Sequence, residues 1–199
     1  MTRTVAAGAG RVGRNGRHRR TATLRILDLC GGTGAWSKPY RDAGYDVEIV
    51  DPVADGRDAR LLQRINARVH GILCAPVCTV FSYARNRYPP TDAELLQALS
   101  LVDACHRIVM VQSPTWWALE NPRNKIRRYL GPARLEFYHW EYGDAAHKPT
   151  CIWGEFTVPT KSPKPRTKAS TWRTKKENAS PIDAITPAGF ARAFYEVNP

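Results

Sequence analysis

The feature that most constrains the fold of this chain is a short apolar segment that stops at a run of glycines. Residues 24–29 are mostly apolar, and Cys30-Gly31-Gly32-Thr33-Gly34 follows directly. This pattern is typical of a buried parallel strand that enters a tight turn, because glycine lets the backbone change direction sharply. A helix is expected next, over residues 37–43. The segment therefore predicts the first strand–turn–helix unit of an α/β protein.

The same alternation of short apolar runs and helical patterns continues along the chain. Further strands are expected at 47–50, 71–75, 116–119, 135–142 and 151–158. Helices are expected at 61–66, 91–111 and 186–197, the second opened by a capping box of Thr91 and Glu94 and the third by Pro187 at its first helical position. The pattern predicts a mostly parallel sheet with helices on both faces.

The length of 199 residues suits one domain. We expect a flexible basic arm at 1–23 and one folded domain at 24–199, with a basic loop at 159–181 inserted before the last helix. No apolar run approaches the ~20 residues that cross a bilayer, and no signal-peptide core is present at the start of the sequence. A soluble, cytoplasmic protein without membrane contact is expected, and a monomer.

The net charge of +12 is concentrated in two segments. Residues 1–24 carry six arginines and no acidic residue, and residues 161–176 carry seven lysines and arginines and no acidic residue. The remainder is nearly neutral. Such a layout favours contact with a polyanion, because each neutralised phosphate releases condensed counterions. A solvated tail and a solvated loop are the plainer interpretation.

Five cysteines, an odd number without C-x-x-C spacing, argue against a disulfide framework and against a zinc site. No metal ion is expected. Each cysteine is either a small buried apolar residue or a reactive thiol.

Chemically distinctive residues follow the first two predicted strands, where an open α/β sheet binds its ligands. Gly32 and Gly34 allow the backbone to approach a ligand closely, while Ser37 stands where a dinucleotide fingerprint would have its third glycine. Asp51 ends the next strand at the distance from Gly31 at which a carboxylate can accept both hydroxyls of a ribose. Together they suggest a nucleoside cofactor without a pyrophosphate; an ordinary strand-to-helix turn and a surface turn are the alternatives.

The next two strand ends carry a thiol and a carboxyl group. Cys78 follows the proline turn of Pro76, where a thiolate exposed to the ligand crevice could act as a nucleophile. Glu120 lies where partial desolvation would favour its protonated form, which can donate a hydrogen bond. Alternatively, Cys78 packs in the interior and Glu120 caps the next helix.

Taken in order, these segments resemble the motifs of the cytosine carbon-5 methyltransferases, which bind S-adenosylmethionine. The family's motifs run from a glycine loop, a ribose acid, a Pro-Cys nucleophile and Glu-Asn to a Gln-x-Arg-x-Arg strand and a C-terminal helix. The matching segments here are 28–37, Asp51, 76–78, 120–122, 142–154 and 186–194. The last resembles the tail of short members found in bacteriophages, and the whole resemblance spans 24–199.

The resemblance implies a Rossmann-like S-adenosylmethionine-dependent methyltransferase fold, DNA as partner, and a bacterial or phage-infected host cell. It implies that Cys78 adds to carbon 6 of cytosine, Glu120 hydrogen-bonds ring nitrogen 3 and the exocyclic amine, and Lys148 holds the base carbonyl. The cofactor contacts that it implies are Asp28, Gly31, Gly32, Gly34, Trp36, Asp51, Pro52, Asp58 and Pro76. Those to nucleic acid are Arg85, Arg87, Lys161, Lys164, Arg166 and Lys168.

The chain departs from the family at several positions. Val77 replaces a proline before the nucleophile, and Cys30 stands where an aromatic residue commonly packs at the cofactor, so that Trp36 or Pro52 is expected to flank the adenine. Lys148 and Thr150 occupy the two arginine positions, and lysine lacks the planar fork of arginine.

The segment that holds a target-recognition domain in longer members is short here. Little sequence specificity is therefore expected, or a very short context read by residues 157–181. Two alternatives to DNA methylation stay open: methylation of cytosine in RNA, where a looped-out base needs no flipping, and a catalytically weak module that binds cofactor and nucleic acid.

Overall fold

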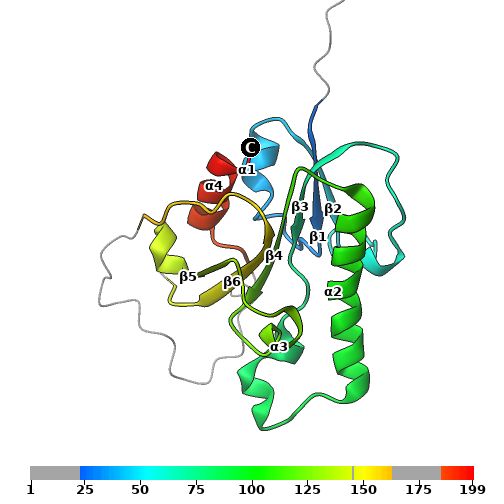
Figure 1. Ribbon diagram of the computed structural model, residues 1–199, viewed down its shortest axis with the longest axis vertical. Coiled ribbons are helices and arrows are strands. Elements are labelled where there is room, and N and C mark those ends of the chain that lie inside the picture. The colour runs from blue at the N-terminus through cyan, green and yellow to red at the C-terminus, as the bar shows by residue number, and fades with distance from the viewer. Residues whose placement is uncertain (1–22, 145, 163–184) are drawn as a thin grey trace, which may run out of the picture.

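A computed structural model describes residues 23–144, 146–162 and 185–199, and they fold around one six-stranded sheet (Figure 1). The strand order is β2-β1-β3-β4-β6-β5. The strands are β1 (Arg25–Leu29), β2 (Asp46–Val50), β3 (Val69–Cys74), β4 (Trp116–Pro122), β5 (Leu135–Tyr138) and β6 (Pro149–Glu155). The expected α/β class is confirmed.

The sheet is mixed, so the expectation of a mostly parallel sheet is only partly right. Strands β2, β1, β3 and β4 pair in parallel, whereas β6 pairs antiparallel with both β4 and β5. Strand β6 follows β5 after only the ten residues 139–148, which include a 3-10 helix at His139–Tyr142, whereas the single-turn helix α3 (Arg127–Leu130) lies between β4 and β5. A parallel connection needs a crossover of a dozen or more residues, usually a helix.

Register within the parallel part aligns three strand ends at one edge. Leu29 of β1 lies beside Cys74 of β3, and Cys74 lies beside Leu119 of β4. The residues that follow, among them Cys30 and Glu120, therefore leave the sheet at the same edge. An open α/β sheet binds its ligands there.

Helices cover both faces of the sheet. The long helix α2 (Asp92–Gln112) packs on one face through residues that include Val102 and Ile108. On the other face lie α1 (Lys38–Asp42) and the C-terminal helix α4 (Ala188–Val197), which Figure 1 shows beside each other. The Tyr40 hydroxyl of α1 donates a 2.8 Å hydrogen bond to the carbonyl of Asn198, which ties the C-terminus to the first helical unit.

Three predicted elements differ from the observed ones. The helix expected at 61–66 is a single 3-10 turn, η1 (Ala59–Leu61), and the strand expected at 135–142 gives way after Tyr138 to a 3-10 helix, η4 (His139–Tyr142). The strand expected to reach residue 158 ends at Glu155. Apolar content alone cannot locate these boundaries, because 3-10 turns and strands share short apolar runs.

The start signals of the two longer predicted helices have different outcomes. The capping box is confirmed: Glu94 N–H donates to the Thr91 hydroxyl at 3.2 Å, and Thr91 N–H donates to the Glu94 carboxylate at 2.7 Å. Pro187 is the N-cap of α4, with an extended backbone, rather than its first helical residue.

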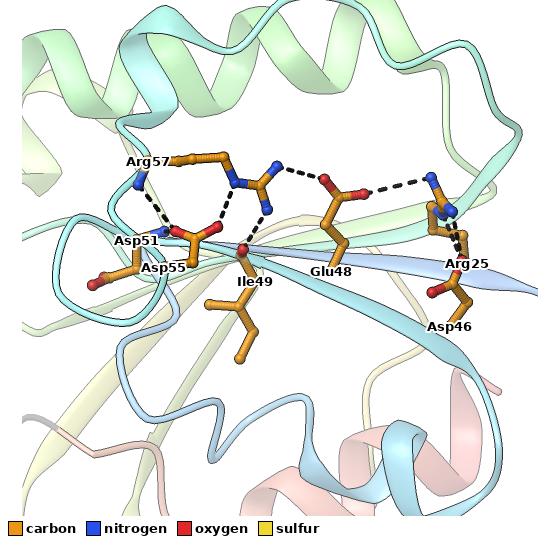
Figure 2. Close-up of polar contacts among 7 residues, drawn as sticks. All are labelled: Arg25, Asp46, Glu48, Ile49, Asp51, Asp55 and Arg57. Atoms are coloured by element: carbon orange, nitrogen blue, oxygen red, sulfur yellow. Dashed lines mark hydrogen bonds and ion pairs between the residues drawn. The ribbon is translucent and has the colours of Figure 1, made fainter.

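A ladder of ion pairs runs along β2 and the loop after it (Figure 2). Glu48 bridges the guanidinium of Arg25, at 3.5 Å, and that of Arg57, at 2.7 Å. Arg57 also pairs with Asp55 and donates to the carbonyl of Ile49 at 2.8 Å. The ladder fastens the loop that follows β2, which contributes Asp51 to the candidate site.

Replacing Glu48 by Gln is expected to lower the free energy of unfolding by less than about 1 kcal/mol, because partly exposed ion pairs contribute little. Urea unfolding at low and high salt measures it, and the difference between wild type and variant should shrink at high salt. Asp42→Asn, which removes an exposed pair with Lys38 on α1, is the matched control. A loss of several kcal/mol would show that the ladder is part of the cooperative core.

Among the residues that the structure describes, no helix has both the length and the apolar character that crossing a bilayer requires.

Candidate active site

A cavity of about 270 Å³ opens at the edge of the sheet where β1, β3 and β4 end. Its walls come from five segments that are far apart in sequence. The residues that line the cavity are Cys30, Gly31, Gly32, Thr33, Ala35, Ala75, Pro76, Val77, Cys78, Thr79, Glu120, Pro122, Lys148, Ile185 and Thr186. Most of the segments singled out in the sequence thus meet at one cavity.

The glycine loop forms one wall of the cavity. Asp28, fully buried at the end of β1, accepts a 2.5 Å hydrogen bond from the Ser37 hydroxyl and so anchors the loop to the start of α1. A Cβ at Gly31 would lie 2.4 Å from the Asp28 carboxyl group, whereas a Cβ at Gly32 would meet nothing within 4 Å. The loop therefore needs glycine at position 31 to close over Asp28, and its backbone at position 32 faces open space.

Asp51 is bonded mainly to its own turn. Its Oδ1 accepts the N–H groups of Val53 and Ala54 at 2.9 and 3.2 Å, and its Oδ2 accepts that of Gly32 at 3.2 Å. A carboxylate offers about four acceptor positions, so about one is left for a ribose hydroxyl. The contact with Gly32 puts Asp51 directly behind the glycine loop, although it does not line the cavity itself. The expected pairing with both hydroxyls would require this turn to rearrange.

The Pro76-Val77-Cys78 turn is held from behind by two asparagines. Asn121 Nδ2 donates a 3.0 Å hydrogen bond to the Pro76 carbonyl, and Asn124 Nδ2 donates a 3.0 Å hydrogen bond to Asn121 Oδ1. Both asparagines are buried. Neither asparagine has a role that the sequence predicts; the signal for Asn121 is that it follows Glu120. The pair makes the thiol turn and the Glu120 strand end one rigid unit.

Cys78, Glu120 and Lys148 act on one another electrostatically. Burial raises the pKa of the Cys78 thiol above its usual value; the Glu120 carboxylate raises it further, and the Lys148 ammonium lowers it. Burial also raises the pKa of Glu120, against the opposing effect of Lys148. The protonation states of the two acids are therefore linked to each other and to the nearby cation.

A second cysteine, Cys30, lines the same cavity but differs from Cys78 in its surroundings. Its backbone adopts the left-handed region, with φ 57°. Two effects raise the pKa of Cys30 far above its usual value: the larger is a hydrogen bond with the Cys105 thiol, and the second is burial. The Asp51 and Asp58 carboxylates raise this pKa further. At Cys78, in contrast, the Lys148 ammonium lowers the pKa, which makes Cys78 the better candidate for a nucleophile.

Trp36, which is expected to flank the adenine, does not line the cavity. The side chain is 2% exposed and packs against Phe190 and Phe194 of α4, with ring centroids 6.0 and 5.6 Å apart. A tryptophan next to a glycine turn can point to either side of the loop. Here its side chain packs on the face of the sheet that α4 covers.

Other predicted contact residues lie away from the cavity or are engaged elsewhere. Pro52 is exposed beyond the Asp51 turn. Asp58 caps η1 and pairs with Arg60. Arg85 forms a 2.9 Å ion pair with Glu94, at the start of α2, so its charge is already partnered. Arg87 is exposed.

The cationic loop is only partly described. Lys161 is bound to both oxygens of Glu141, at 2.9 and 3.0 Å, and to the carbonyl of Glu136. Lys164, Arg166 and Lys168, together with the arm at 1–22, lie outside the described residues.

The residues around the cavity fit S-adenosylmethionine in two respects. Asp28 Oδ1 is buried without a hydrogen-bond partner in the described structure, and burial raises the pKa of this carboxyl to about 6. The backbone at Gly32 borders open space. An unsatisfied carboxylate oxygen suits a cationic ligand, and the glycine backbone admits its close approach. Gly31, Gly32, Asp28 and Asp51 are the residues that would hold it.

Comparison with solved structures finds the same fold in a protein described as a candidate DNA modification methyltransferase, encoded within a prophage (E. coli). The TM-score is 0.53 and the sequence identity 17%, over 72% of this chain and 52% of the other. The two chains share a fold. This chain spans about half the length of that neighbour. No protein-family model matches the sequence, and no curated protein matches it significantly.

Proposed function

We propose that the protein transfers a methyl group from S-adenosylmethionine to carbon 5 of cytosine in DNA, through a covalent bond to Cys78. The observation that carries the proposal is the meeting of Cys78, Glu120 and Lys148 at one cavity, with the glycine loop on its opposite wall. The neighbour's description as a candidate DNA modification methyltransferase supports methyl transfer to DNA. The choice of cytosine carbon 5 comes from the thiol and carboxyl group.

The proposed chemistry follows from the low nucleophilicity of cytosine carbon 5. The Cys78 thiolate adds to carbon 6, and protonated Glu120 donates to ring nitrogen 3, which stabilises the developing charge. Lys148 contacts the base carbonyl. S-adenosylmethionine, when bound, supplies the electrophilic methyl group that carbon 5 takes up. Loss of the carbon-5 proton then restores the ring and releases Cys78 as thiolate.

Cytosine in a duplex is not accessible to this cavity, so the base must be flipped out or already single-stranded. Unpairing costs a few kcal/mol, which phosphate contacts from the two basic segments would offset. Because few residues separate β6 from α4, sequence specificity is expected to be low.

Mass spectrometry of nucleosides from DNA incubated with the purified protein and labelled S-adenosylmethionine tests the proposal. The expected product is 5-methylcytosine. Random-sequence DNA in the same assay measures sequence specificity, and RNA of matched sequence shows whether DNA or RNA is the substrate. Methylation at adenine, methylation confined to RNA, or no methyl transfer at all would overturn the proposal.

Asn121 supplies a further prediction, because it holds the turn that carries the proposed nucleophile. Asn121→Ala is expected to reduce kcat by about 10- to 100-fold, since small misplacements of a reacting group are that costly. The Kd for S-adenosylmethionine should change little, because the glycine loop is anchored separately through Ser37 and Asp28. Single-turnover kinetics and calorimetry measure the two quantities. A large loss of cofactor affinity with unchanged kcat would contradict this role.

A further inference from the structure

A second, smaller cavity, of about 120 Å³, adjoins the candidate active site. Two strand ends line both: Pro122 and Lys148 border the first cavity, and the next residues, Arg123 and Pro149, border the second. Arg123 N–H donates a 3.0 Å hydrogen bond to the Pro149 carbonyl, which joins the two strand ends. The two cavities are thus bordered by adjacent residues at both strand ends.

Aromatic rings gather at the second cavity. Tyr138 lines it, and the rings of His147 and Trp140 lie near Tyr138, with centroids 4.4 and 6.4 Å from its own. We call these three residues the aromatic platform. All three are partly exposed. Nucleobases stack on such rings, whichever base they are, because every base has a π face.

A cation stands at the edge of the aromatic platform. The Arg123 guanidinium lies 5.8 Å from the centroid of the Tyr138 ring and donates to the Tyr138 hydroxyl at 3.3 Å. Within the described residues it forms no ion pair. The acids that line the cavity are already paired: Glu136 with Arg127, and Glu141 with Lys161, which lines the same cavity. Of the two cations in the lining, Arg123 is thus the one that no carboxylate among the described residues neutralises.

We propose that the second cavity binds the nucleotide next to the target cytosine in single-stranded or unpaired DNA. Its base stacks on the aromatic platform and its phosphate contacts Arg123. The inference rests on the proposed function, because the second cavity can hold the neighbouring nucleotide only if the first cavity holds the cytosine. It supplies a contact outside the reacting base, and it places that contact on β5 and on the adjoining ends of β4 and β6 rather than on the basic loop.

Binding of fluorescent single-stranded oligonucleotides to the full-length protein tests the inference. One strand carries a single cytosine among thymines, and two others have an abasic site immediately before or after that cytosine. For the wild type, one of the abasic strands is expected to bind about tenfold more weakly, because it lacks the base that stacks on the aromatic platform. With Tyr138→Leu all three strands should bind alike, whereas Tyr138→Phe, which keeps the ring, should behave as wild type.

Arg123→Gln tests the phosphate contact. The slope of log K against log salt is expected to fall by about one unit for this variant. Arg64→Gln, an exposed arginine before β3 that lines neither cavity, is the matched control. The inference is overturned if abasic sites weaken binding to Tyr138→Leu as much as binding to the wild type. It is also overturned if neither abasic site weakens binding to the wild type, or if only RNA strands of the same design show the effect. Because binding is measured without methyl transfer, failure to form 5-methylcytosine is a separate result that bears on the proposed function alone.

Discussion

Cys78→Ala is expected to abolish methyl transfer to cytosine, with a loss of at least about 10³-fold, because removal of a nucleophile eliminates the covalent route. Binding of S-adenosylmethionine should persist, since the hydrogen bond that anchors the glycine loop joins Ser37 to Asp28 and does not involve Cys78. Transfer of labelled methyl groups and calorimetry measure the two effects. A protein that still binds the cofactor has folded, so the loss can then be assigned to the thiol.

A DNA strand that contains 5-fluorocytosine provides an independent readout. Fluorine at carbon 5 cannot leave as a proton does, so the bond between the Cys78 sulfur and carbon 6 should remain after methylation. The wild type is expected to give a complex stable in denaturing gels, with Cys78 identified in the adduct by peptide mapping. An adduct at Cys30, or full activity of Cys78→Ala, would contradict the assignment.

Glu120→Gln is expected to slow methyl transfer by about 10²- to 10³-fold, the effect typical of removing a group that stabilises developing charge. The amide can still hydrogen-bond ring nitrogen 3 and the exocyclic amine, but it cannot give up a proton to the ring. The affinity for a cytosine-containing strand should therefore fall much less than kcat. Single-turnover rates and strand binding separate the two.

The same variant is expected to lower the pKa of Cys78. The Glu120 carboxylate raises this pKa and the Lys148 ammonium lowers it, so a neutral residue at position 120 leaves the cation's effect unopposed. Alkylation of Cys78, followed by peptide mapping across a range of pH, should show thiolate forming at lower pH in Glu120→Gln. Lys148→Gln, in which the cation is lost, should shift the alkylation profile to higher pH. Shifts in the reverse directions would contradict the placement of these three groups.

In the wild type, the pH dependence of kcat/KM is expected to be bell-shaped. The reactive form has Cys78 as thiolate and Glu120 protonated, so the pair holds one proton. Below the raised pKa of Glu120 the pair holds two protons, and above the raised pKa of Cys78 it holds none. Activity should fall on both sides, and the alkaline limb should disappear in Glu120→Gln, since the amide has no proton to lose.

Local patterns in the sequence predicted the parallel strands and their ends. The apolar runs before Cys30, Ala75 and Glu120 each end at one edge, because strands that pair in parallel without large register shifts bring their carboxyl ends together. The meeting of the glycine loop, Cys78 and Glu120 at one cavity could thus be expected from chain order. The boundary of η4 and the antiparallel insertion of β6 could not, because short apolar runs do not reveal the direction of pairing.

Side-chain orientation was not available from the sequence. The Trp36 side chain packs in the core against α4, and the Asp51 carboxylate accepts hydrogen bonds from the backbone of its own turn. At such positions, core packing and backbone hydrogen bonds compete with contacts to a ligand. The asparagine support of the Pro76 turn joins two strand ends that are 45 residues apart in the chain. No spacing rule predicts such a contact.

By itself, then, the sequence determined the α/β class, the parallel strand ends, and which chemical groups follow each of them. These follow from local patterning, since hydrophobic periodicity and turn residues act over a few positions. Only the tertiary structure decided which of these groups reach the cavity, which asparagines hold them, and that β5 and β6 build a second cavity beside the first. Those outcomes depend on competition among distant side chains for the same space and the same hydrogen-bond partners.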